Sequence, residues 1–306
     1  MSDQESDLAQ WQARAREWLR SSAPPRDSAD VAGLGSVAVF DNLTFEQEQE
    51  QLAAAAAWQR AKLAAGYGAI TWSPEFGGAG LAPAYEEAFG REEAQVAVPR
   101  KNELFSVTLE LVAPTVAAFG TPAQQRELIP RLLAAELFVC QLFSEPGAGS
   151  DLASLSLRAE RRDEGWVLNG QKLWTSYAQY ADFGVIVART DPTVAKHKGL
   201  TYFWIDMKSP GVTVRPVKLM TGDATVNEVF FDNVRIPDSQ RLGGVGEGFA
   251  VAMETLFIER YTAADESGFG PPAAYLAAYA RALATDAGPA IEDGRIRREI
   301  ASAYRQ

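Results

Sequence analysis

A first group of residues that could do chemistry lies in residues 140–151, which read CQLFSEPGAGSD. Ser144 and the backbone N–H groups of the Gly-rich turn 146–150 could donate hydrogen bonds to the polar edge of a flat ring. Gly147 and Gly149 would let the backbone approach a ligand more closely than a residue with a side chain could. These residue types would suit one wall of a flavin site.

A second group follows in residues 169–176, which read NGQKLWTS. Trp174 could lie against the ring system of a flavin, and Ser176 could donate to a ring nitrogen. The alternative interpretation of both segments is a Gly-Pro turn and a core tryptophan in a β domain. Residue types alone leave both interpretations open.

The elements before residue 137 are predicted to be helical. Apolar residues recur at helical spacing from Leu8 to Leu19, and an Ala- and Gln-rich pattern extends from Phe45 to Ala65. Thr121 followed by Pro122 is typical of a helix start. Further helices are expected over residues 83–96, 102–119 and 122–135. We therefore predict an N-terminal helical domain over residues 1–136.

The pattern changes to short strands after Phe138, and helices return near Phe249. Strands are expected over residues 155–160, 165–168, 184–188, 200–205, 212–216 and 227–231. The predicted turns are 163–165, 169–170, 209–211 and 221–223, and the later helices are 249–263, 271–284 and 293–306. Short strands at this spacing predict a central antiparallel β-barrel or sandwich domain over residues 137–245. The helical segment 246–306 is expected to be part of a C-terminal bundle, so the fold class is α+β with several domains.

Composition excludes several kinds of function. A net charge of −11 argues against nucleic acid as a partner. The single cysteine, Cys140, permits no intrachain disulfide, and together with the single histidine, His197, it cannot build a zinc site of the usual kind. This composition also argues against a Ser-His-Asp or Cys-His hydrolase. No apolar run is long enough to span a membrane, and the acidic start Met1–Glu5 has neither a signal-peptide nor a transit-peptide layout. We expect a cytoplasmic protein.

The two segments together resemble the flavin-binding middle domain of the acyl-CoA dehydrogenases. That family carries Thr or Ser before Glu-Pro-x-Ala-Gly-Ser-Asp, and later Asn-Gly-x-Lys-x-Trp followed by hydroxyl residues; this chain matches nearly every position. Further matches lie at Trp72–Gly80, Phe231–Pro237 and Gly246–Phe249. The resemblance extends through about residue 265 and implies FAD as the cofactor.

The resemblance also assigns residues to the site. It implies that the isoalloxazine is faced by Gln141, Phe143 and Ser144 and walled by Trp174, Thr175 and Ser176. Gly149 belongs to the same cofactor-binding turn, and Ser150 would lie between the flavin and the pantetheine arm of CoA. These roles are what the family resemblance implies.

The implied reaction is α,β-dehydrogenation of an acyl-CoA thioester to the trans-2-enoyl-CoA. It requires a buried carboxylate beside the flavin as base. One of the two family positions for this base is a Glu-Arg pair on the first helix after the β domain, which predicts Glu259 as base and Arg260 as its charged neighbour in substrate binding. The apolar residues 256–258 favour burial of Glu259, and the alternative is a surface Glu-Arg pair on an amphipathic helix.

One departure from the family concerns the part of the FAD site that a partner subunit supplies. Residues 282–295 lack the expected Phe-Gly, and the C-terminal bundle looks incomplete, so we expect a homo- or hetero-oligomer. Electron-transfer flavoprotein is the implied electron acceptor in lipid degradation. Two alternatives remain open: a flavin oxidase or monooxygenase on the same scaffold, and a flavin-deficient subunit of a heteromeric acyl-CoA dehydrogenase. The acyl group itself cannot be read from the sequence.

Overall fold

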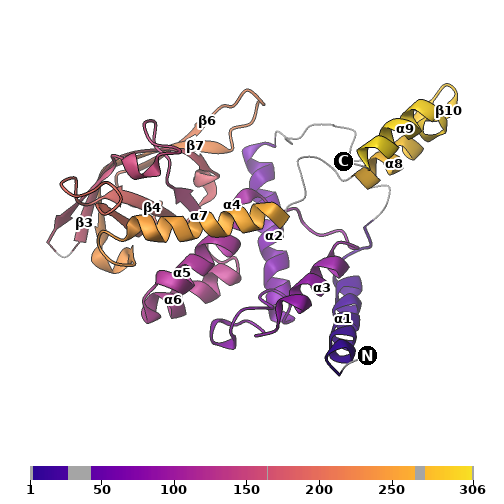
Figure 1. The fold of residues 1–306 in the computed structure, drawn as a ribbon, viewed down its shortest axis with the longest axis horizontal. Coiled ribbons are helices and arrows are strands. Elements are labelled where there is room, and N and C mark those ends of the chain that lie inside the picture. Colours follow the sequence, from indigo (N-terminus) through magenta and orange to yellow (C-terminus); the bar gives the residue numbers. More distant parts are fainter. Residues whose placement is uncertain (1–2, 27–42, 164, 266–272, 305–306) are drawn as a thin grey trace. The chain divides into compact units, whose positions relative to one another are not determined.

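The computed structural model describes residues 3–26, 43–163, 165–265 and 273–304 (Figure 1). The chain divides into two compact units. The helical unit comprises residues 1–41, 84–98 and 264–306, and the sheet unit comprises residues 42–83 and 99–263. The predicted boundaries of three domains, 1–136, 137–245 and 246–306, remain predictions.

The helical unit contains α1 (Asp3–Ser22), α3 (Pro83–Glu93), α8 (Ala273–Ala282) and α9 (Gly294–Ala303). An ion pair joins α1 to α3, with Arg16 Nε 2.7 Å from Glu92 Oε2. A backbone bridge between Pro25 and Val96 joins the segments that follow these two helices. Near the C-terminus, the short strands β9 (Ala284–Thr285) and β10 (Gly288–Pro289) and the 3-10 turn η7 (Ala290–Glu292) connect α8 to α9.

The helices of the sheet unit agree closely with those expected from the sequence. They are α2 (Phe45–Ala64), α4 (Glu103–Ser106), the π-helical η3 (Val107–Val112), α5 (Ala113–Phe119), α6 (Pro122–Leu133) and α7 (Gly248–Asp265), with the 3-10 turn η2 at Pro74–Phe76. Thr121 caps α6 in a capping box with Gln124, which confirms the predicted helix start. Among the described residues, no helix combines the length and hydropathy needed to cross a membrane.

The middle of the chain forms one eight-stranded sheet. Its strands are β1 (Val139–Leu142), β2 (Arg158–Arg162), β3 (Gly165–Ser176), β4 (Phe183–Arg189), β5 (Leu200–Asp206), β6 (Val212–Val217), β7 (Val226–Pro237) and β8 (Arg241–Leu242), with the 3-10 turns η4 (Leu152–Ser154), η5 (Ala178–Tyr180) and η6 (Asp238–Gln240) between them. The order is β6-β7-β3-β2-β4-β5-β8, and β1 joins β4 in parallel. Most pairs are antiparallel as expected, but these pairings describe an open path and not a closed barrel.

The two faces of the sheet are buried separately, as the period of two residues in a strand requires. On β4, Val185 and Val187 pack in the core shared with α5, α6 and α7, whereas Ile186 and Ala188 pack in the core shared with α2 and α4. Figure 1 shows α7 (orange) in front of the strands and above α5 and α6. The helix that carries Glu259 therefore covers one defined face of the sheet.

The predicted turn at Asn169-Gly170 was wrong. Both residues lie inside β3, which continues to Ser176 and shifts its register against β7 between Leu168 and Gly170. Gly170 has φ 146°, and a Cβ there would lie 2.9 Å from the Leu157 Cα. The glycine serves a bulge and a close backbone approach instead of a chain reversal.

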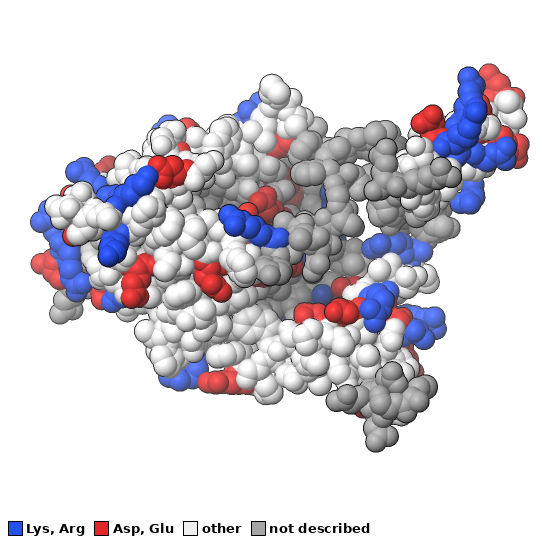
Figure 2. All heavy atoms as spheres, viewed as in Figure 1, with Lys and Arg blue, Asp and Glu red and all other residues white. Residues whose placement is uncertain are grey.

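Acidic and basic side chains are interspersed over the visible face of the sheet unit (Figure 2). Neither sign of charge covers this face alone, and the whole sequence carries a net charge of −11.

Candidate active site

The end of β1 and the residues after it form the first part of the candidate site. Gln141 and Ser144 are half-buried, whereas Phe143 is buried and its ring centroid lies 5.8 Å from that of Tyr202. The Ser144 carbonyl accepts a hydrogen bond of 2.9 Å from the Leu173 N–H, which joins this segment to β3. The Phe143 side chain is thus committed to the core, and its predicted contact with a flavin remains a prediction.

A buried ion pair stabilises this segment from inside the protein. Lys172 Nζ lies 2.9 Å from Glu145 Oε1 and donates to the Phe143 carbonyl at 3.0 Å. The Glu145 carboxylate also accepts from the Ser156 N–H at 2.6 Å and the Leu157 N–H at 3.0 Å. The Lys172 ammonium and both oxygens of the Glu145 carboxylate therefore have hydrogen-bond partners.

The charges of this pair depend on each other. Burial lowers the pKa of Lys172 to about 8, against the opposing attraction of Glu145. Burial by itself would raise the pKa of Glu145, but the Lys172 charge and the two backbone N–H donors outweigh burial and hold that pKa below its usual value. Each charge of the pair therefore favours the ionised form of the other.

The end of β3 presents Trp174 through a β-bulge. Lys172 pairs with Val229 and Thr175 with Asn227, so two residues of β3 stand opposite one residue of β7. Trp174 takes the left-handed conformation, φ 61°, and its side chain is 56% exposed. A bulky residue in this conformation is strained, which is a common feature of functional sites.

The next two residues point in different directions. Thr175 is 1% exposed, and its Oγ1 has no hydrogen-bond partner among the described residues. Ser176 is half-buried at the strand end. Of the three predicted wall residues, Trp174 is the one that the structure leaves largely open to a ligand.

The Gly-rich turn leaves space beside the strand ends. A Cβ at Gly147 or Gly149 would meet no heavy atom within 4 Å, and neither residue has a positive φ. The fold itself therefore does not require glycine at these positions, whereas a ligand lying close to the backbone would. Ser150 is exposed on the same turn. This open flank, Trp174 and the hydroxyl donors fit a flat, polar-edged ring such as a flavin.

The predicted base reaches this region from α7. Glu259 Oε2 lies 3.5 Å from Gln141 Nε2, at the outer limit of a hydrogen bond. Both Glu259 and Arg260 are exposed. The expected burial of Glu259 was wrong for the described residues: the preceding Phe257 is itself 53% exposed, so the apolar run does not bury this turn of the helix.

Buried hydroxyl groups fix α7 one turn before Glu259. Thr255 Oγ1 lies 3.0 Å from Thr115 Oγ1 on α5 and 3.4 Å from the Tyr202 hydroxyl on β5. Residues four apart lie on the same face of a helix, so the face that is anchored at Thr255 carries Glu259. The Tyr202 ring in turn packs against Phe143.

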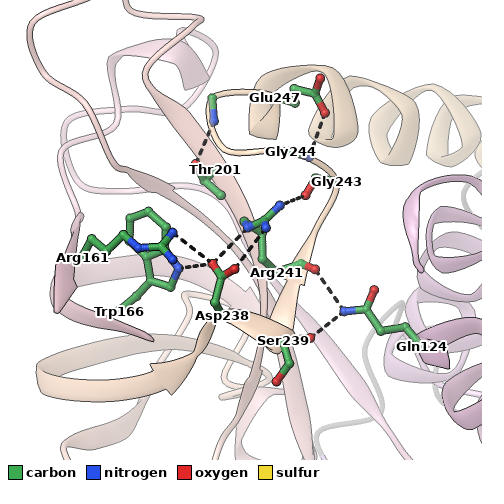
Figure 3. A network of polar contacts seen from close by, with 11 residues as sticks. Gln124, Arg161, Trp166, Thr201, Asp238, Ser239, Arg241, Gly243, Gly244 and Glu247 are labelled. Atoms are coloured by element: carbon green, nitrogen blue, oxygen red, sulfur yellow. Dashed lines mark hydrogen bonds and ion pairs between the residues drawn. The ribbon is translucent and has the colours of Figure 1, made fainter. Parts of the chain in front are cut away.

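A polar network fixes the start of α7 (Figure 3). Asp238 accepts from Trp166 Nε1 at 2.7 Å and from Arg241 Nη2 at 3.1 Å, and Gln124 Nε2 on α6 donates to the Arg241 carbonyl at 3.0 Å. The Gly246 N–H donates to Thr201 at 3.1 Å. These bonds attach the exit of the sheet to both α6 and β5, and thereby orient the helix that carries Glu259.

Several of these residues were missed by reasoning from sequence. Glu145 and Lys172 stood inside the two motifs but were given no role, and nothing in the local sequence pointed to Thr255 or Tyr202. The sequence offered one signal for the buried ion pair. Lys172 lies two residues before Trp174, on a strand face that is otherwise apolar. The described residues include no group of three metal-ligating side chains.

Sequence families and individual known proteins match this chain and point to the same group of relatives. Residues 41–136 match "Acyl-CoA dehydrogenase, N-terminal domain", and residues 140–234 match "Acyl-CoA dehydrogenase, middle domain". Acyl-CoA dehydrogenase FadE34 of Mycobacterium tuberculosis is 42% identical over 80% of this chain and 33% of its own length. Acyl-CoA dehydrogenase IpdE1 of the same organism is 40% identical over 83% of this chain and 63% of its own length.

A solved structure extends the comparison to the whole chain. The ChsE4–ChsE5 complex of Mycobacterium tuberculosis aligns with a TM-score of 0.68 and 26% identity, over 100% of this chain and 73% of the other. The chain spans a third of FadE34 and a little under two thirds of IpdE1.

Proposed function

The chain belongs to the acyl-CoA dehydrogenase family, and on that premise we propose that it binds FAD and dehydrogenates the α,β-bond of an acyl-CoA thioester. The observation that carries the proposal is the approach of Glu259 Oε2 to Gln141 Nε2 at 3.5 Å. It brings a carboxylate from α7 to the strand end that carries the flavin-binding motif.

The residues of the chain would have separate roles in cofactor binding and in proton abstraction. Ser144, Gly149, Trp174 and Ser176 would hold the isoalloxazine, with Gln141, Phe143 and Thr175 supporting it from the two strands. Glu259 would take the α-proton of the thioester. The electron pair of that C–H bond would form the new C=C bond as the β-hydrogen leaves with its own electron pair. Bound FAD would supply the hydride acceptor.

The remaining roles concern substrate and partners. Ser150 would face the pantetheine arm, and Arg260 would orient the substrate beside Glu259. Electron-transfer flavoprotein would reoxidise the flavin. We further propose an oligomer, homomeric or heteromeric, in which a neighbouring subunit completes the FAD pyrophosphate site; the similar ChsE4–ChsE5 structure is itself a complex.

The decisive experiment is anaerobic mixing of FAD-loaded protein with a panel of acyl-CoA esters. We expect bleaching of the flavin by at least one ester, with the enoyl-CoA detected by mass spectrometry. Glu259→Gln should slow bleaching about 100-fold or more, because it removes the general base. Glu254→Gln, an exposed glutamate on the same helix, is the matched control and should keep the parental rate.

Other outcomes separate the alternatives. FAD-loaded protein that no acyl-CoA bleaches contradicts the proposed reaction, and fast reoxidation of the reduced flavin by O₂ would identify an oxidase or monooxygenase. Colourless protein that takes up no FAD, even with its natural partner present, would identify a flavin-deficient subunit.

A further inference from the structure

The peptide group between Phe143 and Ser144 lies at the centre of the candidate site, and Lys172 fixes its orientation. Lys172 Nζ donates to the Phe143 carbonyl at 3.0 Å, and the Lys172 side chain is fully buried. The carbonyl oxygen therefore points into the protein, toward the buried ammonium. Among the described residues Lys172 is the hydrogen-bond donor to this oxygen.

The orientation of the carbonyl decides where the N–H of the same peptide points. The described residues contain no cis peptide bond, and in a trans peptide the C=O and N–H point in opposite directions. The Ser144 N–H therefore points away from the buried ammonium. It has no acceptor among the described residues, and Ser144 itself is only half-buried.

The neighbouring peptide is fixed as well. The Ser144 carbonyl accepts from the Leu173 N–H at 2.9 Å, and the Glu145 N–H donates to the Ala148 carbonyl at 2.8 Å. With both flanking groups paired, the Ser144 N–H remains as a backbone donor without an acceptor among the described residues. An available donor beside an exposed aromatic ring is what the polar edge of a flavin requires.

We propose that Lys172 is a positioning residue that aims the Ser144 N–H at the flavin by holding the Phe143 carbonyl inward. This inference rests on the FAD binding in the proposed function. Without the ammonium, the Phe143 carbonyl would be buried without a donor, and the peptide would turn toward another partner, because an unpaired buried carbonyl is costly. The N–H would turn with it.

A matched pair of variants separates this role from simple stabilisation by the ion pair. Lys172→Met removes the donor to the Phe143 carbonyl, whereas Glu145→Gln breaks the ion pair but leaves the Lys172 amine, charged or neutral, to donate. Both should lower Tm. We expect Lys172→Met to raise the Kd for FAD about tenfold or more above that of Glu145→Gln, measured by flavin fluorescence well below both melting temperatures. Equal Kd values in the two variants would overturn the proposal.

The unmodified protein supplies a second test that needs no variant to fold. In FAD-free protein, the Ser144 amide should exchange with solvent hydrogen quickly, and FAD should slow its exchange at least about tenfold, measured by NMR. A Ser144 amide that is already protected without FAD overturns the peptide orientation. FAD that binds without slowing this exchange overturns the role of the donor. Parental protein that takes up no FAD contradicts the proposed function, while the exchange rate of the free protein still tests the orientation.

Discussion

Gln141 and Glu259 are 118 residues apart in the chain, yet Gln141 Nε2 lies 3.5 Å from Glu259 Oε2. The first stands on β1 and the second on α7, which Thr255 ties to β5 and α5 through buried hydroxyls. The amide of Gln141 is therefore a neutral donor directed at the carboxylate proposed as the base.

Replacing this neutral donor by a charge should impair the reaction more than deleting it. Gln141→Glu would place a second carboxylate at the same distance from Glu259, and the repulsion should displace Glu259 and slow flavin reduction about tenfold or more. Gln141→Ala removes only a weak hydrogen bond and should slow reduction a few-fold. Stopped-flow reduction by a bleaching acyl-CoA measures both rates, and equal rates in the two variants would show that Glu259 does not act beside Gln141.

Trp174 should matter for FAD binding and little for folding. Its side chain is 56% exposed and its backbone is left-handed, a conformation that asparagine adopts more readily. Trp174→Asn should therefore change the free energy of unfolding by less than about 1 kcal/mol, yet raise the Kd for FAD about tenfold or more.

The matched control for Trp174 is Trp166, which is buried. Trp166→Phe deletes the hydrogen bond from Nε1 to Asp238 and should cost about 1 kcal/mol of stability, with FAD affinity retained. Chemical denaturation and FAD titration measure the two quantities. A Trp174→Asn variant that binds FAD as tightly as the parent would remove Trp174 from the site.

Local patterns were enough to predict most of the elements. The Thr121-Pro122 signal marks the start of α6, and short runs of apolar and β-branched residues mark β4 and β5, because capping and strand propensity depend on neighbours in sequence. The family motif likewise placed Trp174 and Ser144 at two strand ends that the structure joins through the Leu173 N–H.

Features that depend on distant residues could not be predicted in this way. The bulge that exposes Trp174 arises from the register between β3 and β7, and Gly170 was mistaken for a turn because its close neighbour, Leu157, lies on another segment. The exposure of Glu259 is set by what packs on α7. Its apolar neighbours in the sequence did not reveal it.

The Asp238 network should contribute stability that is lost in acid. Hydrogen bonds from Arg241 and then Trp166 lower the pKa of Asp238 to about 2. A carboxylate with a lowered pKa in the folded state stabilises the protein above its unfolded pKa, near 3.8, and this contribution disappears as the pH falls toward 2. Asp238→Asn should therefore lower the free energy of unfolding by about 1 to 2 kcal/mol at pH 7, after allowance for partial exposure.

The pH dependence identifies the cause. The parent and Asp238→Asn should differ less in free energy of unfolding, measured by urea denaturation, as the pH falls from about 4 toward 2. Asp286 is exposed, so Asp286→Asn should change this free energy little at any pH. A difference between parent and Asp238→Asn that is independent of pH would mean that the carboxylate charge is not its source.

The hydroxyl groups around Thr255 should act as one connected cluster. Three hydroxyl protons are available from Tyr202, Thr255 and Thr115. The Tyr202 hydroxyl has Thr255 as its partner, and Thr115 lies 2.7 Å from the Leu111 carbonyl. Tyr202 can therefore donate to Thr255 and Thr115 to Leu111, whereas the Thr255 proton has two acceptors, the Thr115 hydroxyl at 3.0 Å and the Val251 carbonyl at 3.1 Å.

Removing the middle member should leave the other two incompletely paired. Thr255→Val should lower the free energy of unfolding by about 1 to 3 kcal/mol, and Thr255→Ser, which keeps the hydroxyl, should lower it by less. Because Thr255 anchors the helix face that carries Glu259, Thr255→Val should also slow flavin reduction several-fold while leaving the Kd for FAD unchanged. In the double variant Tyr202→Phe/Thr255→Val, the loss of stability should be smaller than the sum of the two single losses, since neither hydroxyl is then left unpaired. Strictly additive losses of stability would contradict the coupling of these hydroxyl groups. A parental rate of flavin reduction in Thr255→Val would contradict their role in placing Glu259.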